Sequence, residues 1–195
     1  MIEEIVLATG NKGKIREFTG LLEGAFGKIV SLNDLGSPPE VIEDGKTFEE
    51  NALKKARAIA IYSGMPALAD DSGLEVEALG GRPGVYSARY AGEGATDRDN
   101  INKLLLELRG VENSKARFVC VLALVTPEGK EIVAEGSCGG VILTEPRGEG
   151  GFGYDPVFYL PEFGKTMAEI PPTLKNKISH RARAAESLIG RLQGI

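Results

Sequence analysis

Two carboxylates stand side by side in the chain, Asp70 and Asp71, directly after the apolar residues 67–69. Adjacent carboxylates are costly unless they are well solvated or meet a cation. Carboxylate oxygens suit Mg²⁺, which usually takes one or two of them together with substrate phosphates. Because alternate side chains of an extended segment point in opposite directions, we expect only one of the pair to face a site fully. The alternative is a plain turn, since Asp-Ser-Gly is common turn chemistry.

A second segment, Thr9–Lys14, contains two glycines and two lysines and follows the apolar run Ile5–Ala8. Glycines let the backbone approach a ligand, and the N-terminus of a following helix attracts anions. Lys14 lies one turn inside that helix and points back towards its start. The segment therefore favours a phosphate cradle, although the Walker A pattern is absent. The alternative is an ordinary strand-to-helix turn with exposed lysines.

A third segment, residues 147–156, is rich in glycine and contains a literal G-x-G-x-x-G match. A dinucleotide fingerprint requires a helix to open there. Asp155 precedes a proline, which disfavours helix, so we reject that interpretation. A glycine loop that presents Phe152 and Tyr154 is more typical of a stacking platform for a base. A glycine-rich surface loop is the alternative.

The fourth segment, Lys175–Arg181, holds the only histidine of the chain, His180. A lone histidine is more often structural than catalytic. Here its neighbours Lys175, Arg181 and Arg183 can only donate hydrogen bonds. Such a donor-rich edge is suited to a keto oxygen or a phosphate.

These four segments are predicted to lie at the ends of strands, where open α/β sheets bind ligands. Apolar runs predict strands over residues 5–8, 28–32, 67–69, 116–126 and 130–143, extended chain over 74–79, and a loop over 33–46. Helical spacing predicts helices after residue 11, over 48–64, after Thr96 and at the end of the chain. Capping boxes at Thr47–Glu50 and Thr96–Asp99 mark two of the helix starts. Because helices and strands alternate around one long hairpin at 127–129, the predicted class is α/β with a mixed sheet.

Composition limits the function classes. The chain has 195 residues, 42% of them hydrophobic and 26% charged, so we expect one globular domain over residues 1–195. The net charge of −5 argues against a nucleic-acid coat, and no nucleic-acid partner is expected. Cys120 and Cys138 are expected as small buried side chains in strands. No signal peptide fits the acidic start, and the longest apolar run, Phe118–Val125, falls far short of the ~20 residues that span a bilayer. We therefore expect a cytoplasmic protein with no membrane partner.

Six motifs, in this order, resemble the inosine triphosphate pyrophosphatase family of non-standard purine nucleoside triphosphate pyrophosphatases. They are Thr9-Gly10-Asn11 with Lys14, Phe48-Glu49-Glu50-Asn51-Ala52, Ala69-Asp70-Asp71-Ser72-Gly73-Leu74, the stretch Gly80–Arg89, Gly151-Phe152-Gly153-Tyr154-Asp155-Pro156, and Ser179-His180-Arg181. They span nearly the whole chain.

The resemblance implies an elongated mixed β-sheet flanked by helices, in two lobes with an active-site cleft between them. It also implies a homodimer that uses Mg²⁺ to hydrolyse ITP, dITP and XTP to the monophosphate and pyrophosphate. Asp71 would be both metal ligand and general base. A second metal ligand would come from the acidic loop before the first capping box, with Glu43 chosen and Glu40 and Asp44 as alternatives.

The same resemblance implies a set of substrate-binding residues, with the triphosphate at the first segment and Lys55, and the nucleotide at the others. They are Thr9, Gly10, Asn11, Lys12, Gly13, Lys14, Lys55, Ser72, Phe152, Gly153, Tyr154, Asp155, Lys175, His180 and Arg181. Two other function classes compete with this one. A nucleotide-binding or sensing protein would keep the site without the catalysis. A dinucleotide-dependent oxidoreductase would rest on the glycine match that we reject.

Overall fold

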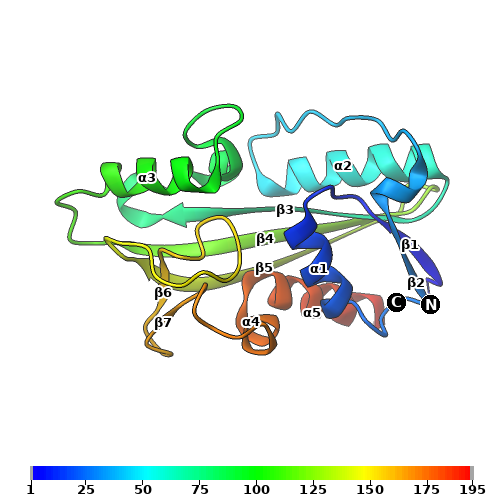
Figure 1. Ribbon diagram of the computed structural model, residues 1–195. Coiled ribbons are helices and arrows are strands. Elements are labelled where there is room, and N and C mark those ends of the chain that lie inside the picture. The colour runs from blue at the N-terminus through cyan, green and yellow to red at the C-terminus, as the bar shows by residue number, and fades with distance from the viewer. Residues whose placement is uncertain (1, 194–195) are drawn as a thin grey trace. The chain divides into compact units, whose positions relative to one another are not determined.

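A computed structural model describes residues 2–193; Met1, Gly194 and Ile195, the ends of the predicted 1–195 domain, lie outside the described residues. Helices and strands alternate through the first part of the chain (Figure 1). In order, the elements are β1 (Glu4–Leu7), α1 (Lys12–Leu21), β2 (Lys28–Ser31), α2 (Phe48–Ser63), β3 (Ala67–Val76), α3 (Asp97–Glu107), β4 (Lys115–Val125), β5 (Glu131–Ile142), β6 (Phe158–Leu160), β7 (Lys165–Thr166), α4 (Pro172–Ile178) and α5 (His180–Gln193). Short 3₁₀ helices cover Leu32–Leu35, Glu77–Leu79 and Gly84–Arg89.

The strands form one seven-stranded sheet in the order β2-β1-β3-β4-β5-β6-β7. β1 runs parallel to β2 and β3, with Val6 opposite Ala67 and Leu7 opposite Leu68. β6 runs antiparallel to both β5 and β7. The predicted α/β class with a mixed sheet is confirmed.

The chain divides into two compact units. The first takes the chain up to Asp71, Cys120–Gly136 and the chain from His180 onward, and the second takes Ser72–Val119 and Ser137–Ser179. The chain therefore crosses between the units four times, directly after Asp71, Val119, Gly136 and Ser179. β3, β4 and β5 each contribute residues to both units.

In the first unit, helices cover both faces of the strands. Figure 1 shows α2 on one side and α1 with α5 on the other. Phe18 of α1 and Leu188 of α5 are fully buried against strand residues such as Leu122. Gly136 of β5 permits the close approach of α5, because a Cβ there would lie 2.2 Å from the backbone nitrogen of Ala184. This packing fixes the starts of α1 and α5 beside the carboxyl ends of β1 and the first half of β3.

The second unit has its own apolar core. Leu74 of β3, Leu104 of α3 and Val157 are fully buried in it. The rings of Phe118 and Phe158 pack with centroids 4.3 Å apart. This core supports the loop between β5 and β6, which carries the glycine-rich segment.

The local predictions fare well. Both capping boxes are present, Thr47 with Glu50 and Thr96 with Asp99, and each starts the predicted helix. α2 buries the apolar face formed by Phe48, Ala52, Ala56, Ile59 and Ala60, and it ends at Gly64 in the left-handed conformation. Cys120 and Cys138 are buried in β4 and β5, as predicted. No helix opens in residues 148–157, which agrees with the rejection of a dinucleotide fingerprint.

Two predicted element ends are wrong: the end of the strand predicted over residues 67–69 and the end of the extended chain predicted over 74–79. The strand that was expected to end at Asp70 continues without a turn to Val76, so the carboxylate pair lies in the middle of β3. The physical reason is burial: Leu74 and Val76 are fully buried in the core of the second unit, which holds the segment extended against its local turn chemistry. Residues 77–79, expected to be extended, form a 3₁₀ helix. Among residues 2–193, no helix is both long and apolar enough to cross a membrane.

Candidate functional site

The start of α1 is built by its own polar residues. Asn11 is the N-cap, and its Oδ1 accepts a hydrogen bond from the backbone N–H of Lys14 at 3.1 Å. The hydroxyl of Thr9 accepts another from the N–H of Asn11 at 3.2 Å. Gly10, Asn11 and Lys12 are exposed, and Gly13 is half-buried. The segment thus presents an exposed helix start, a position at which backbone N–H groups stabilise anions.

Lys14 links this helix start to β3. Its ammonium lies 2.8 Å from Oδ2 of Asp70, a residue that is 1% exposed. Burial would raise the pKa of this carboxyl, but the charges of Lys14, Lys55 and Arg181 outweigh it and lower the pKa to about 2. Asp70 is therefore an ionised, buried anchor for basic side chains.

Asp71, the next residue, has the opposite electrostatics. Burial raises its pKa, and the nearby charge of Glu43 adds to the rise. Three interactions lower the pKa without cancelling the rise: the charge of Lys55, the hydrogen bond that Asn51 donates, and the charge of Lys14. The Nδ2 of Asn51 donates to Oδ2 of Asp71 at 2.9 Å. Two adjacent carboxylates are thus pushed apart in proton affinity, a pattern that often separates an anchor from a working acid or base.

Lys55 of α2 stands among three carboxylates. Its ammonium donates to Oε2 of Glu43 at 2.8 Å. Burial lowers its pKa, but attraction to Asp70, Asp71 and Glu43 gives a net rise. Lys55 is therefore charged, and this point of the site already stabilises a cation.

The acidic loop offers one carboxylate to this cluster. Glu43 is half-buried, pairs with Lys55 and acts electrostatically on Asp71. Asp44 instead pairs with the exposed Lys54 at 2.5 Å, and Glu40 is exposed. Of the three acidic residues considered from the sequence, Glu43 is the one for which the structure records an electrostatic interaction with Asp71.

The donor chemistry of this cluster fits a hard divalent cation. Glu43 and Asp71 supply carboxylate oxygens next to a position that favours positive charge. Within residues 2–193, no three His, Cys, Asp or Glu side chains gather closely enough to hold a metal by themselves. Mg²⁺ does not require such a cage, because it usually binds one or two carboxylates and completes its shell with water and substrate phosphates.

The second unit holds the residues that the sequence predicts beside a nucleobase. Asp155 and Lys175 form a buried ion pair with 2.5 Å between Oδ2 and Nζ. The same Oδ2 accepts the backbone N–H of Phe152 at 3.1 Å, and the Lys175 ammonium lies 5.2 Å from the centroid of the Phe152 ring. A Cβ at Gly151 would lie 2.0 Å from Asp155 Oδ2, so this turn requires glycine. The result is an aromatic ring backed by a neutralised ion pair.

Two contacts fix this loop, and sequence reasoning missed both. Oδ2 of Asp97, the first residue of α3, accepts the N–H of Gly153 at 2.7 Å. The hydroxyl of Tyr154 donates to the carbonyl of Ser87 at 2.8 Å, and burial raises the pKa of this tyrosine. No local pattern marks these contacts, because their partners are far along the chain.

The start of α5 belongs to the first unit. His180 is 1% exposed, and Arg181 next to it is 5% exposed. Nη1 of Arg181 donates to Oε2 of Glu17 in α1 at 3.0 Å. Glu17 is another residue that sequence reasoning missed, and nothing in its sequence position distinguishes it from a surface glutamate.

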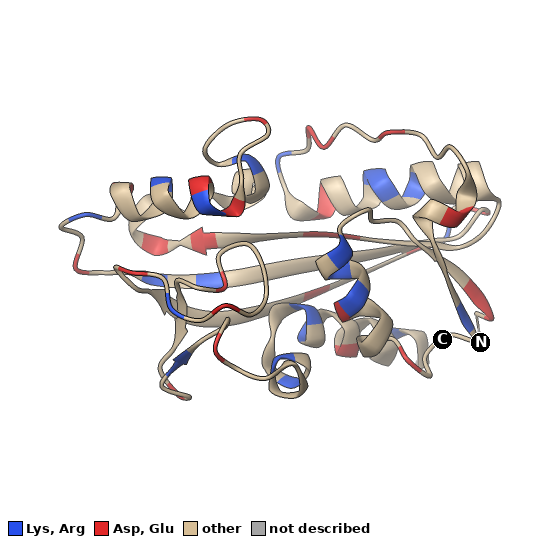
Figure 2. Ribbon diagram, in the orientation of Figure 1, with Lys and Arg blue, Asp and Glu red and all other residues tan. Residues whose placement is uncertain are grey.

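The candidate site residues therefore fall into two groups. We call the first the charged group; it consists of Lys14, Glu43, Lys55, Asp70 and Asp71, all in the first unit. We call the second the aromatic group; it consists of Phe152, Asp155 and Lys175, all in the second unit. Ser72 is half-buried in β3 and belongs to the second unit. Figure 2 shows Lys and Arg along α1, although the chain as a whole carries a net charge of −5.

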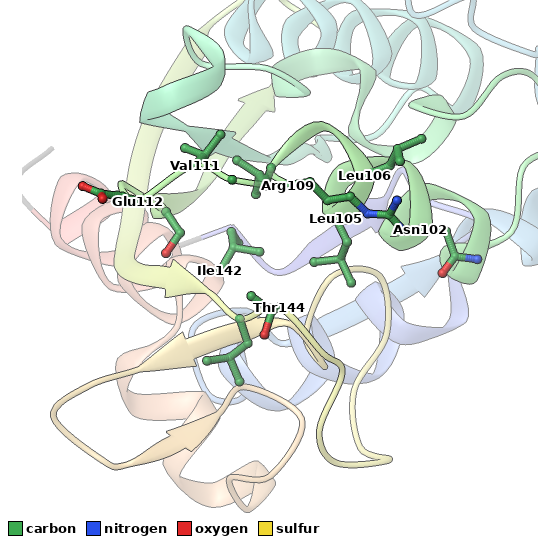
Figure 3. A pocket seen from close by; sticks show the side chains of 12 residues that line it. Asn102, Leu105, Leu106, Arg109, Val111, Glu112, Ile142 and Thr144 are labelled. Atoms are coloured by element: carbon green, nitrogen blue, oxygen red, sulfur yellow. The ribbon is translucent and has the colours of Figure 1, made fainter.

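A cavity of about 760 Å³ lies elsewhere in the second unit. It is lined by the end of α3, the following loop and the end of β5, with Leu105, Ile142 and Thr144 around it (Figure 3). None of the predicted site residues is among the residues that line it.

Comparison with known proteins places this geometry among relatives. The Ham1 family model matches residues 5–191. A dITP/XTP pyrophosphatase of Geobacter sulfurreducens is 56% identical over 98% of this chain and 98% of its own, and one of Desulfotalea psychrophila is 56% identical over 94% and 82%. Among solved structures, a HAM1 protein from Coxiella burnetii has a TM-score of 0.90 at 44% identity, and the alignment covers all of both chains. The Ham1 protein of Staphylococcus aureus has a TM-score of 0.89 at 44% identity, with 98% and 99% covered.

Proposed function

The chain belongs to the Ham1 family, and from that premise we propose that it is a nucleoside triphosphate pyrophosphatase. Its substrates are the deaminated purine nucleotides ITP, dITP and XTP, and its products are the nucleoside monophosphate and pyrophosphate. Two relatives that are 56% identical to it are named dITP/XTP pyrophosphatase. The reaction removes these nucleotides from the pool of free nucleotides.

The observation that carries the proposal is the split between Asp70 and Asp71. Asp70 is ionised and holds Lys14, whereas the pKa of Asp71 is raised by burial. A buried carboxylate with raised proton affinity is suited to accept a proton from water.

The charged group can then be assigned roles. Water attacks the α-phosphorus, the bond from that phosphorus to the bridging oxygen breaks, and Asp71 takes the proton that the water loses. Lys14 and the start of α1 hold the triphosphate, and Lys55 neutralises the departing pyrophosphate. Phosphoryl transfer is mostly positioning and charge neutralisation, so these residues need no separate nucleophile.

Glu43 and Asp71 are the residues that would hold Mg²⁺. When bound, the ion supplies positive charge that polarises the phosphate and lowers the pKa of water. Protein ligands of this type are consistent with an ion that is shared with the substrate phosphates.

The aromatic group is proposed to bind the base. Phe152 offers a face for stacking, and stacking tolerates any base. His180 and Arg181 are proposed to donate towards the keto oxygen at C6, an edge at which adenine carries a donor instead. The homodimer and the cytoplasmic location are carried over from the family resemblance, and light scattering after size exclusion tests the first of them.

The test is pyrophosphate release by the purified full chain from ITP, dITP, XTP, ATP, GTP, CTP and UTP. Each nucleotide is measured with Mg²⁺ and with EDTA. Asp71→Asn removes the proposed base, and Glu49→Gln, which changes an exposed carboxylate in the first turn of α2, is its control for the loss of one negative charge.

We expect pyrophosphate from the three deaminated purines, little from the others, and none in EDTA. Release of orthophosphate instead would move the attack to the γ-phosphorus. Tight binding of ITP without any product would favour the nucleotide-sensing alternative over the enzyme.

A further inference from the structure

One buried amide joins two parts of the charged group. Asn51 of α2 is 1% exposed, and both ends of its side chain are used. Nδ2 donates to Oδ2 of Asp71 at 2.9 Å, while Oδ1 accepts the backbone N–H of Gly45 at 2.8 Å. Gly45 lies two residues after Glu43. A single side chain therefore ties the carboxylate of β3 to the loop that carries the other carboxylate.

The contact between Asn51 and the loop leaves no space for a side chain at Gly45. A Cβ at Gly45 would lie 2.6 Å from Oδ1 of Asn51 and 2.9 Å from Cβ of Glu50. The same loop end is held again by Glu50, whose Oε2 accepts the N–H of Lys46 at 2.6 Å. One turn further along α2, Lys55 donates to Glu43 itself. The first two turns of α2 thus set where this loop lies.

The start of α3 offers an internal comparison. Thr-x-x-Asp-Asn there matches Thr-x-x-Glu-Asn in α2, and Asn100 occupies the same position after the capping box as Asn51. Asn100 is also buried, and its Oδ1 also accepts a backbone N–H from the preceding loop, that of Ala91, at 2.8 Å. Its Nδ2, however, donates to the carbonyl of Ala88 at 3.1 Å. Both asparagines hold the loop before their helix by accepting a backbone N–H. Of the two, Asn51 donates to a carboxylate, whereas Asn100 donates to a backbone carbonyl.

We propose that Asn51 is a positioning residue for the hydrolysis: it fixes the Asp71 carboxylate and the Glu43 loop at one separation, so that both can reach the same phosphate-bound cation. The inference rests on the proposed function, because it assigns Asn51 a role in that reaction. Outer residues that orient ligands in this way change metal affinity or activity by about 10- to 100-fold when they are replaced.

The test compares Asn51→Asp with Asn100→Asp. Each change keeps the acceptor for the loop N–H and removes the donor, at the same position of the two helices. For Asn51→Asp we expect kcat for ITP to fall by about 10- to 100-fold and the Mg²⁺ concentration for half-activation to rise. For Asn100→Asp we expect a lower Tm, with kcat and the Mg²⁺ requirement unchanged.

A second readout needs neither metal nor substrate. Amide hydrogen exchange of the metal-free protein should show Gly45 protected in the wild type and in Asn51→Asp, and exposed in Asn51→Ala. Gly45→Ala provides an independent route if the Asn51 variants fold poorly. It displaces the loop while Asn51 stays, and it should raise the Mg²⁺ requirement as well.

The outcomes separate the two ideas. An active wild type with Asn51→Asp indistinguishable from Asn100→Asp in kcat and Mg²⁺ requirement would overturn the inference alone. Equal exchange at Gly45 in the wild type and Asn51→Ala would also overturn it. A wild type that releases no pyrophosphate from any triphosphate would overturn the proposed function, and the inference with it.

Discussion

The charged group and the aromatic group differ in how their charges are held. In the charged group, the lysines and carboxylates come from α1, α2, β3 and the acidic loop, and Lys55 is attracted by three carboxylates at once. In the aromatic group, Asp155 and Lys175 are buried and pair with each other, and the Lys175 ammonium lies beside the Phe152 ring. The charges of the first group can adjust when an anion or a cation binds, whereas the charges of Asp155 and Lys175 already offset each other.

Because of this difference, we expect turnover to depend on the charged group and affinity on the aromatic group. A network with a carboxylate of raised pKa can move a proton, so its loss should appear in kcat. A neutral platform with an aromatic face contributes contact to any base, so its loss should appear in KM. Variants in the two groups test this division between kcat and KM.

The largest expected effect is from Asp71→Asn. The amide cannot accept the proton and is a poor metal ligand, so kcat for ITP should fall by at least ~10²-fold. ITP binding, measured by calorimetry, should survive in part because Lys14 and the aromatic group remain. Turnover near that of the wild type would place the base elsewhere, and Glu43 would then be the next carboxylate to replace.

The second effect tests Asp70 as an anchor rather than a reacting group. Its folded pKa of about 2 lies below the value of 3.8 in the unfolded chain. The carboxylate therefore stabilises the fold above pH ~4, and this stabilisation disappears as the pH falls through the folded pKa; its size is roughly 2 to 3 kcal/mol. At pH 7, the Asp70→Asn variant should therefore have an unfolding free energy that is lower by this amount.

Urea unfolding of metal-free protein at pH 7 and pH 3 provides the measurement. The gap in unfolding free energy between wild type and Asp70→Asn should narrow by about 1 kcal/mol at the lower pH. A constant gap would mean that Asp70 contributes through packing and not through its charge.

The local parts of this architecture follow from the sequence. The capping boxes, the helical spacing of α1 and α2 and the hairpin at Gly129 are each specified within a few residues, and each is predicted from the sequence. The candidate residues Lys14, Lys55 and Asp71, proposed from separate segments, share electrostatic interactions in the folded chain.

The rest depends on distant partners. β3 continues through Asp70 because of two cores that form from remote segments, and its local Asp-Ser-Gly pattern indicates a turn instead. Asn51 meets a carboxylate 20 positions away, and Glu17 meets Arg181 at a separation of 164. β6 and β7 contain three and two residues, too few for a pattern of their own.

A third prediction concerns the triphosphate. Lys14→Ala removes a charged donor at the start of α1, and hydrogen bonds to charged groups contribute enough that KM for ITP should rise by at least about 10-fold. Binding of IMP should weaken much less, because the monophosphate lacks the β- and γ-phosphates. Arg16→Ala, an exposed basic residue of the same helix, is the matched control. Equal weakening of ITP and IMP would assign Lys14 to the folding of β3 through Asp70 alone.

The smallest expected effect is in the aromatic group, with Phe152→Ala. Loss of one stacking face should raise KM by about 5- to 10-fold, the lower end of the range for base stacking. The increase should be similar for ITP, XTP and GTP, because every base has a face to stack, and kcat should hold. Tyr86→Ala, an aromatic that is 57% exposed in the same unit, controls for the loss of a ring. A fall in kcat with KM unchanged would break the division, because it would give the neutral platform a part in the reacting geometry and not only in holding the base.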